Sequence, residues 1–167
     1  MIPLLGIDPG PIESGWAIRH EEGKWFFGNT ENTKLADGDI WVWNVLKIIG
    51  IERIQPRFVP GKPGGRGGYI GKETLETCEW VGRFDCLAGC IPHLIYRATL
   101  GTALCGSPRA KDTDIKAAII DRFGGDAKSV VGTKKNPGPL FGTRGLGSHV
   151  WIALGCALVA EEQKRKE

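Results

Sequence analysis

A short apolar run that ends in a single carboxylate is the feature that most constrains this chain. Residues 4–7 form the run, Asp8 follows it, and Pro9 and Gly10 break it at once. A second apolar run covers residues 15–18. Runs of this length bounded by turn residues predict two buried strands joined as a hairpin. A buried carboxylate is costly unless it is paired or binds a metal, so Asp8 predicts a nearby cation. The alternative is an Asp that only caps the turn.

Composition predicts one globular domain. The chain has 167 residues, a net charge of +3, 25% charged residues and 41% hydrophobic residues. This length suits one domain over residues 1–162, and residues 163–167 form a charged tail. The five cysteines include no CxxC pair, which favours reduced thiols. With neither a basic-then-apolar leader nor an apolar run of membrane-spanning length in the sequence, we expect a soluble intracellular protein and no membrane partner.

Hydrophobic periodicity predicts a mixed sheet covered by helices, because three strands precede the first helix and another strand follows it. The further expected strands are residues 24–30, 51–55 and 93–96, and the expected helices are residues 40–49, 72–90, 97–104, 112–123 and 149–162. The expected N-terminal caps of three helices are Asp39, Asp112 or Thr113, and Ser148. The helix at residues 72–90 is apolar over more than one stripe, so it is the candidate dimer contact.

Two loops rich in Gly, Pro and basic residues are the candidate DNA contacts. They span residues 56–71 and 126–147, and a basic connector lies at residues 107–111. Cations interleaved with aromatic residues suit phosphate contact and base stacking, although plain surface loops are the alternative. The candidate DNA-binding residues are Arg57, Phe58, Lys62, Arg66, Tyr69, Arg109, Lys134, Lys135 and Arg144.

Three residues from separate elements form a candidate metal site. Asp8 ends the first strand, Glu52 lies in a later strand, and His149 opens the last helix. Two carboxylates favour a hard cation such as Mg²⁺ or Mn²⁺, and Mn²⁺ tolerates an imidazole better. Two such ions about 4 Å apart would activate water and stabilise the leaving oxygen in phosphodiester hydrolysis.

Four motifs along the chain resemble the RuvC family of Holliday-junction resolvases, in the ribonuclease-H-like superfamily, and phage-type members most. They are GIDPG at 6–10, IERIQ at 51–55, KDTDIKAAIIDRFG at 111–124, and NPGPLFG with SHVWIAL within 136–154. Sugar-kinase and actin-like ATPases open similarly but need two such domains, so no small-molecule cofactor is expected. The resemblance implies an α/β fold with a mixed five-stranded sheet flanked by helices. It also implies a homodimer, four-way branched DNA as partner, and the cytoplasm of a bacterium or phage-infected host.

The resemblance also implies residue roles. Asp8 would bridge two metal ions, Glu52 would be the second acid, His149 would be a ligand from the last helix, and Lys111 would support the cleaved phosphate. The loop after Glu52 would probe the junction centre. Gln55 stands where an aromatic is often found, so Phe58 is the candidate wedge.

One position departs from the family pattern. The family usually carries another carboxylate at i+3 from the His149 position, but this chain has Ile152 there, and the next acid is Glu161. We expect a crossover junction endodeoxyribonuclease. The alternatives are a junction-binding protein with impaired cleavage and a ribonuclease-H-like nuclease acting on another branched substrate.

Overall fold

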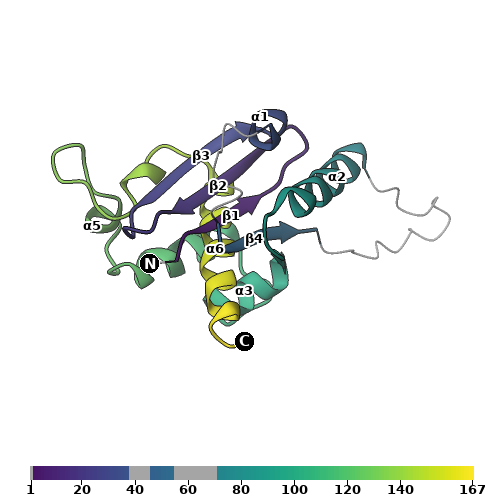
Figure 1. Cartoon of the computed structure of the whole chain (residues 1–167). Helices are drawn as coiled ribbons and strands as arrows, with labels where there is room; N and C mark the ends of the chain where they lie inside the picture. The colour runs from purple at the N-terminus through teal and green to yellow at the C-terminus, as the bar shows by residue number, and fades with distance from the viewer. Residues whose placement is uncertain (1, 38–45, 55–70) are drawn as a thin grey trace.

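A mixed five-stranded sheet forms the centre of the molecule (Figure 1). The computed structural model describes residues 2–37, 46–54 and 71–167. The strands are β1 (Leu4–Asp8), β2 (Glu13–Arg19), β3 (Trp25–Glu31), β4 (Ile48–Arg53) and β5 (His93–Tyr96), in the spatial order β3-β2-β1-β4-β5. β1, β2 and β3 pair antiparallel, whereas β1, β4 and β5 run parallel. The predicted fold class and the predicted β1–β2 hairpin are confirmed.

Helices cover both faces of this sheet. They are α1 (Asn32–Ala36), α2 (Lys72–Leu87), α3 (Arg97–Cys105), α4 (Asp112–Arg122), α5 (Ala127–Val131), a short 3-10 helix, η1 (Phe141–Thr143), and α6 (Ser148–Lys164). Side chains alternate between the faces of a strand. Leu5 and Ile7 of β1 therefore join a cluster with Phe84 of α2, whereas Leu4 joins the opposite cluster with α3, α4 and α6.

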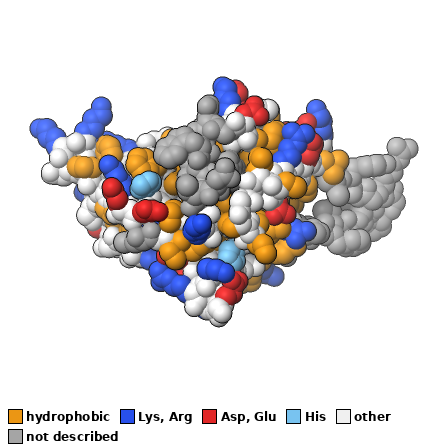
Figure 2. All heavy atoms as spheres, in the orientation of Figure 1, with side chains coloured by type: hydrophobic (Ala, Val, Ile, Leu, Met, Phe, Trp, Pro, Cys, Tyr) orange, Lys and Arg blue, Asp and Glu red, His pale blue; other side chains and the backbone are white. Residues whose placement is uncertain are grey.

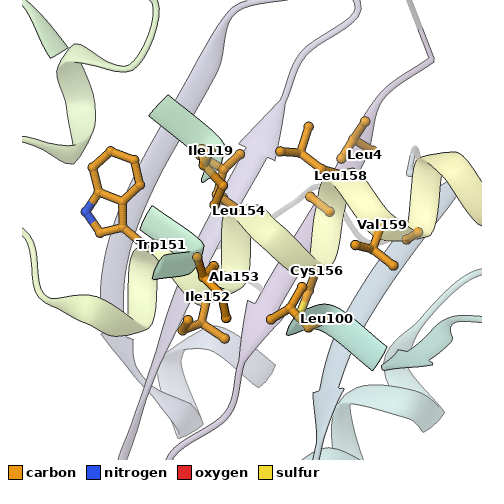
Figure 3. Close-up of a cluster of buried hydrophobic side chains, with 14 of the residues drawn as sticks. Leu4, Leu100, Ile119, Trp151, Ile152, Ala153, Leu154, Cys156, Leu158 and Val159 are labelled. Atoms are coloured by element: carbon orange, nitrogen blue, oxygen red, sulfur yellow. The ribbon is translucent and has the colours of Figure 1, made fainter. Parts of the chain in front are cut away.

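α6 is the central helix of the larger cluster. All side chains from Val150 to Ala160 are buried, and those labelled in Figure 3 pack with Leu4, Leu100 and Ile119. A helix that is apolar on all sides must be enclosed on all sides. Strands β1, β2 and β4 enclose it on one side, and α3 and α4 on the other.

Glycines on three adjacent strands allow α6 to lie directly against the sheet. A Cβ on Gly6 of β1 would meet the Ala153 carbonyl oxygen at 1.8 Å, and a Cβ on Gly50 of β4 would meet the Cys156 carbonyl oxygen at 2.3 Å. A Cβ on Gly15 of β2 would lie 2.6 Å from the His149 backbone. The helix therefore crosses β2, β1 and β4 in backbone contact.

An ion pair holds the far end of α6 to β2. Arg19 donates two hydrogen bonds to the Glu161 carboxylate, at 2.7 and 3.0 Å. Both side chains are largely buried, and the bidentate arrangement fixes their geometry. Hydrogen bonds from Arg19, together with its charge, hold the pKa of Glu161 below its ordinary value. α6 is thus fixed to the sheet at both ends of its buried stretch.

The expected helix over residues 40–49 and the expected strand over 51–55 are wrong in their bounds. β4 already begins at Ile48 and ends at Arg53, and Gly50 lies within it. A parallel strand buried on both faces is a continuous apolar run, which periodicity cannot separate from a buried helix. Residues 38–45, which include Asp39, lie outside the described residues.

Smaller differences concern short helices and helix ends. α1 was not predicted, and α5 and η1 lie within the expected loop 126–147. Lys111 and Gly147 occupy the N-cap positions of α4 and α6, where the sequence favoured Asp112 or Thr113 and Ser148. α2 ends earlier than expected, and α6 runs past residue 162. Among the helices of the described ranges, none has the length and apolarity that a membrane crossing requires.

Two glycine substitutions, one at the helix–sheet contact and one on an open helix surface, should change the stability of the protein in opposite directions. Gly6→Ala should lower the free energy of unfolding by about 1–3 kcal/mol or more, because backbone must move to admit the methyl group. Gly82→Ala on α2, where a Cβ meets nothing within 4 Å, should raise it by about 0.5–1 kcal/mol. Urea denaturation of both variants measures the difference. Equal effects would contradict backbone contact at Gly6.

Candidate active site

The register of two parallel strands brings Asp8 and Glu52 together. Ile7 of β1 lies opposite Ile51 of β4, so Asp8 and Glu52 are the next pair along. Counting alternate residues from Gly6 and Gly50 places both acids on the face that carries α6. Parallel strands end at the same edge, and the two carboxyl groups therefore lie side by side at the carboxyl ends of β1 and β4.

His149 reaches the same point from α6. It lies in the first turn of the helix, where its backbone rests on Gly15, the β2 partner of Asp8. Its Nδ1 lies 2.7 Å from Asp8 Oδ2. The Asp8 side chain is 7% exposed and the His149 side chain 63% exposed, so the site has a buried floor and an open side. The structure thus brings together the three predicted metal ligands.

Burial and neighbouring charges shift the pKa values of Glu52 and His149. Burial, followed by the hydrogen bond with Asp8 and the Asp8 charge, raises the pKa of Glu52 to about 9, although Arg97 acts in the opposite direction. Glu52 therefore holds its proton more tightly than an ordinary glutamate. The hydrogen bond to Asp8 raises the pKa of His149 above its ordinary value, and the charges of Asp8, Asp112 and Glu13 add to this effect. A buried carboxylate stabilised by a shared proton and an imidazole is a place that suits a cation.

Two further charged residues, Arg97 and Asp112, belong to the site and were missed from the sequence. Arg97 is the first residue of α3, directly after β5, and its Nη1 lies 3.4 Å from Glu52 Oε1. Its Nη2 donates to Asp112 at the start of α4. The available signal was an arginine at the carboxyl end of a strand parallel to the one carrying Glu52. The link to Asp112 has no such signal.

The turn after Asp8 is held by a buried polar group. Asn32, at the start of α1, donates from its side chain to the Gly10 carbonyl at 2.9 Å and accepts from the Ser14 hydroxyl at 2.5 Å. The Asn32 backbone N–H also donates to the Ile12 carbonyl. Ser14 and Asn32 are almost fully buried. Satisfied buried groups of this kind specify one conformation, and here they fix the chain on both sides of the turn that follows Asp8.

The predicted phosphate contact, Lys111, lies near the site. It is exposed and precedes Asp112, which binds Arg97, and its backbone N–H donates to Asp114 of the same helix start. Arg109 is exposed in the connector before α4. DNA binding by Arg109 stays a prediction.

Other predicted DNA contacts lie farther along the chain. Lys134 and Lys135 are exposed in the turn closed by the Gly132–Pro137 bridge, and Arg144 is exposed after η1. Figure 2 shows basic side chains at the tip of the turn that projects beside α5. The remaining candidates lie outside the described residues: Arg57, Phe58, Lys62, Arg66 and Tyr69, together with Gln55.

Ile152 faces the core. Its side chain is 2% exposed and belongs to the cluster between α6, α3 and α4 (Figure 3). The turn of α6 after His149 therefore presents an apolar side chain where the family resemblance led us to expect a carboxylate. Any further negative charge must come from another element, and Asp112 is the acid that the structure places beside Arg97.

The donor set fits a divalent cation in part. Asp8 and Glu52 supply carboxylate oxygens of the kind that Mg²⁺ and Mn²⁺ prefer, and His149 supplies one nitrogen. Within the described ranges, however, no three His, Cys, Asp or Glu side chains form a preassembled metal cluster. Instead Asp8 pairs with His149, while Glu52 contacts Arg97. Binding a metal would require these internal pairs to loosen.

Known proteins resemble this chain in their three-dimensional fold and not in their sequences. Neither a family model nor a curated protein matches the sequence. A structure of RuvC from Thermus thermophilus matches with a TM-score of 0.63 and 16% identity, covering 99% of this chain and 96% of that one. This chain has the RuvC fold. A second structure, T. thermophilus RuvC in complex with Holliday junction substrate, matches over the same shares at 15% identity and a TM-score of 0.63.

The hydrogen bond between Asp8 and His149 predicts that the pKa of His149 depends on Asp8. Asp8→Asn should lower the pKa of His149, because the largest cause of its raised value is the bond to the Asp8 carboxylate. The proton on His149 would then be lost at lower pH in the variant than in the wild type. NMR titration of the imidazole signals measures this. The signals of His20 and His93 serve as internal references in the same spectra. An unchanged His149 would contradict the pairing.

Proposed function

We propose that this protein is a metal-dependent endonuclease of the RuvC family that resolves four-way DNA junctions by paired phosphodiester hydrolysis. The observation that carries the proposal is the adjacent pair Asp8 and Glu52, at the carboxyl ends of parallel strands, with His149 bonded to Asp8. The RuvC fold over nearly the whole chain supports this choice among metal-dependent hydrolases.

In this proposal Asp8, Glu52 and His149 hold Mg²⁺ or Mn²⁺, with two ions per site. The bound metal supplies activation of water and stabilisation of the leaving oxygen. His149 orients the Asp8 carboxylate from α6, and Asn32 fixes the turn that follows Asp8. Lys111 lies at the exposed start of α4 and would contact the cleaved phosphate. Water reaches the site from the open side, where His149 is exposed.

The proposed assembly is a homodimer in which each subunit cuts one strand of the junction. Exposed Leu75 and Leu87 on α2, and Ile91 just beyond it, support a contact between two copies along this helix. The basic residues of the two Gly-rich loops and Arg109 would bind DNA phosphates. The proposed location is the cytoplasm of a bacterium or a phage-infected host, with DNA recombination and repair as the processes served.

A labelled four-way junction tests the proposal. We expect nicking with Mn²⁺ or Mg²⁺ and none in chelator. Asp8→Asn should reduce the cleavage rate at least about 100-fold, because it removes the carboxylate that is proposed to bind both metal ions. Asp121→Asn, at an exposed position on α4, is the matched control and should cleave normally. A panel of flaps, forks and RNA–DNA hybrids separates a junction resolvase from a ribonuclease-H-like enzyme that acts on another branched substrate.

Ile152 favours a second candidate, a protein that binds junctions with impaired cleavage. In that case a gel shift should persist in chelator, restored Mn²⁺ should give no nicking, and Ile152→Asp should introduce cleavage. The variant places a carboxylate in an apolar cluster, so its unfolding should be checked with and without Mn²⁺. Efficient nicking by the wild-type chain would exclude this candidate.

A further inference from the structure

We propose that Arg97 is an exchangeable counter-cation of the site: it contacts Glu52 in the metal-free protein and is retained by Asp112 when a divalent cation binds at Glu52. This inference rests on the proposed metal site. It assigns a positioning role to Arg97 and Asp112, which connect the start of α3 to the start of α4. Neither residue belongs to the predicted ligand set.

The geometry places Arg97 between two acids. Nη1 contacts Glu52 at 3.4 Å, and Nη2 is bonded to Asp112. Different nitrogens make the two contacts, so one can be released while the other is kept. The Glu52 contact exceeds ordinary hydrogen-bond length, which indicates a weak bond that is readily broken. Asp112 is half exposed, and Glu52 is largely buried.

The charges of Arg97 and Asp112 should have opposite effects on the binding of a metal ion. The Arg97 guanidinium lies beside a proposed metal ligand, and its like charge opposes any cation placed there. Asp112 reduces this repulsion because it partly neutralises Arg97 and holds it on the solvent side. Asp112 is bonded to Arg97, which contacts Glu52, so a single residue separates its carboxylate from the proposed ligand.

If Arg97 has this role, substitutions of Arg97 and Asp112 should change the metal affinity in opposite directions, whereas a structural role would not. Removing the guanidinium should strengthen metal binding, and removing the Asp112 carboxylate should weaken it by leaving Arg97 with Glu52 as its acidic partner. A purely structural Arg97 would give weaker or unchanged binding in both variants, because loss of the same ion pair would disorder the same contact.

Mn²⁺ binding to the full chain without DNA tests the proposal by calorimetry or by the EPR signal of free Mn²⁺. We expect Arg97→Gln to lower the Kd on the order of 10-fold and Asp112→Asn to raise it several-fold. Arg97→Lys, which keeps the charge, should stay near the wild-type value. Arg122→Gln is the matched control, because Arg122 also links α4 to another helix through Glu162 and lies away from the site.

Each outcome decides the matter. Unchanged or weaker Mn²⁺ binding by a folded Arg97→Gln variant would overturn the proposal. If that variant does not fold, as judged by circular dichroism, Arg97→Met takes its place: tighter binding supports the exchange, and unchanged or weaker binding rejects it. An absence of Mn²⁺ binding by the wild type would reject the metal site itself. The expected order of affinities without any junction cleavage would overturn the proposed function and leave the exchange standing.

Discussion

Backbone contact between α6 and the sheet determines the rest of this structure. Gly15, Gly6 and Gly50 lie on three neighbouring strands and admit successive turns of one helix. A side chain at any of them would lift α6 and open the cluster that it shares with α3 and α4. The same contact sets the height of His149 above Asp8. Packing and site geometry thus have one origin, and the small residues of the strands serve both.

The centre of the site is the buried Asp8 carboxyl group, which is surrounded by hydrogen-bonding and positively charged side chains. Asp8 is bonded to His149 on one side and to Glu52 on the other, and Arg97 contacts Glu52 in turn. This arrangement keeps the acids from repelling each other before any ligand arrives. A cation bound at the proposed ligands would compete with these internal partners, so its affinity would depend on residues outside the ligand set. Arg97 and Asp112 are the clearest of these.

Local signals predicted much of the fold and two acids of the candidate site, Asp8 and Glu52. Pro9 and Gly10 after an apolar run identified β1 and Asp8, and period and turn residues identified β5 and α4. β4 was misplaced because a strand buried on both faces has no alternation. Glu52 was still identified, since an acid in an apolar strand is conspicuous wherever the strand begins. The Arg97 bridge depends on how β5, α3 and α4 fold back on one another, and no local pattern carries that information.

The pairing of Asp8 with His149 joins residues 141 positions apart. During synthesis β1, β2 and β3 can pair as hairpins long before α6 exists, and domains fold as their segments emerge. The two acids are then present on the growing chain without the helix that completes their surroundings. The centre forms only when translation has passed His149 and the glycine-lined face has received its helix. A polypeptide truncated before α6 would carry both acids and still lack the assembled centre.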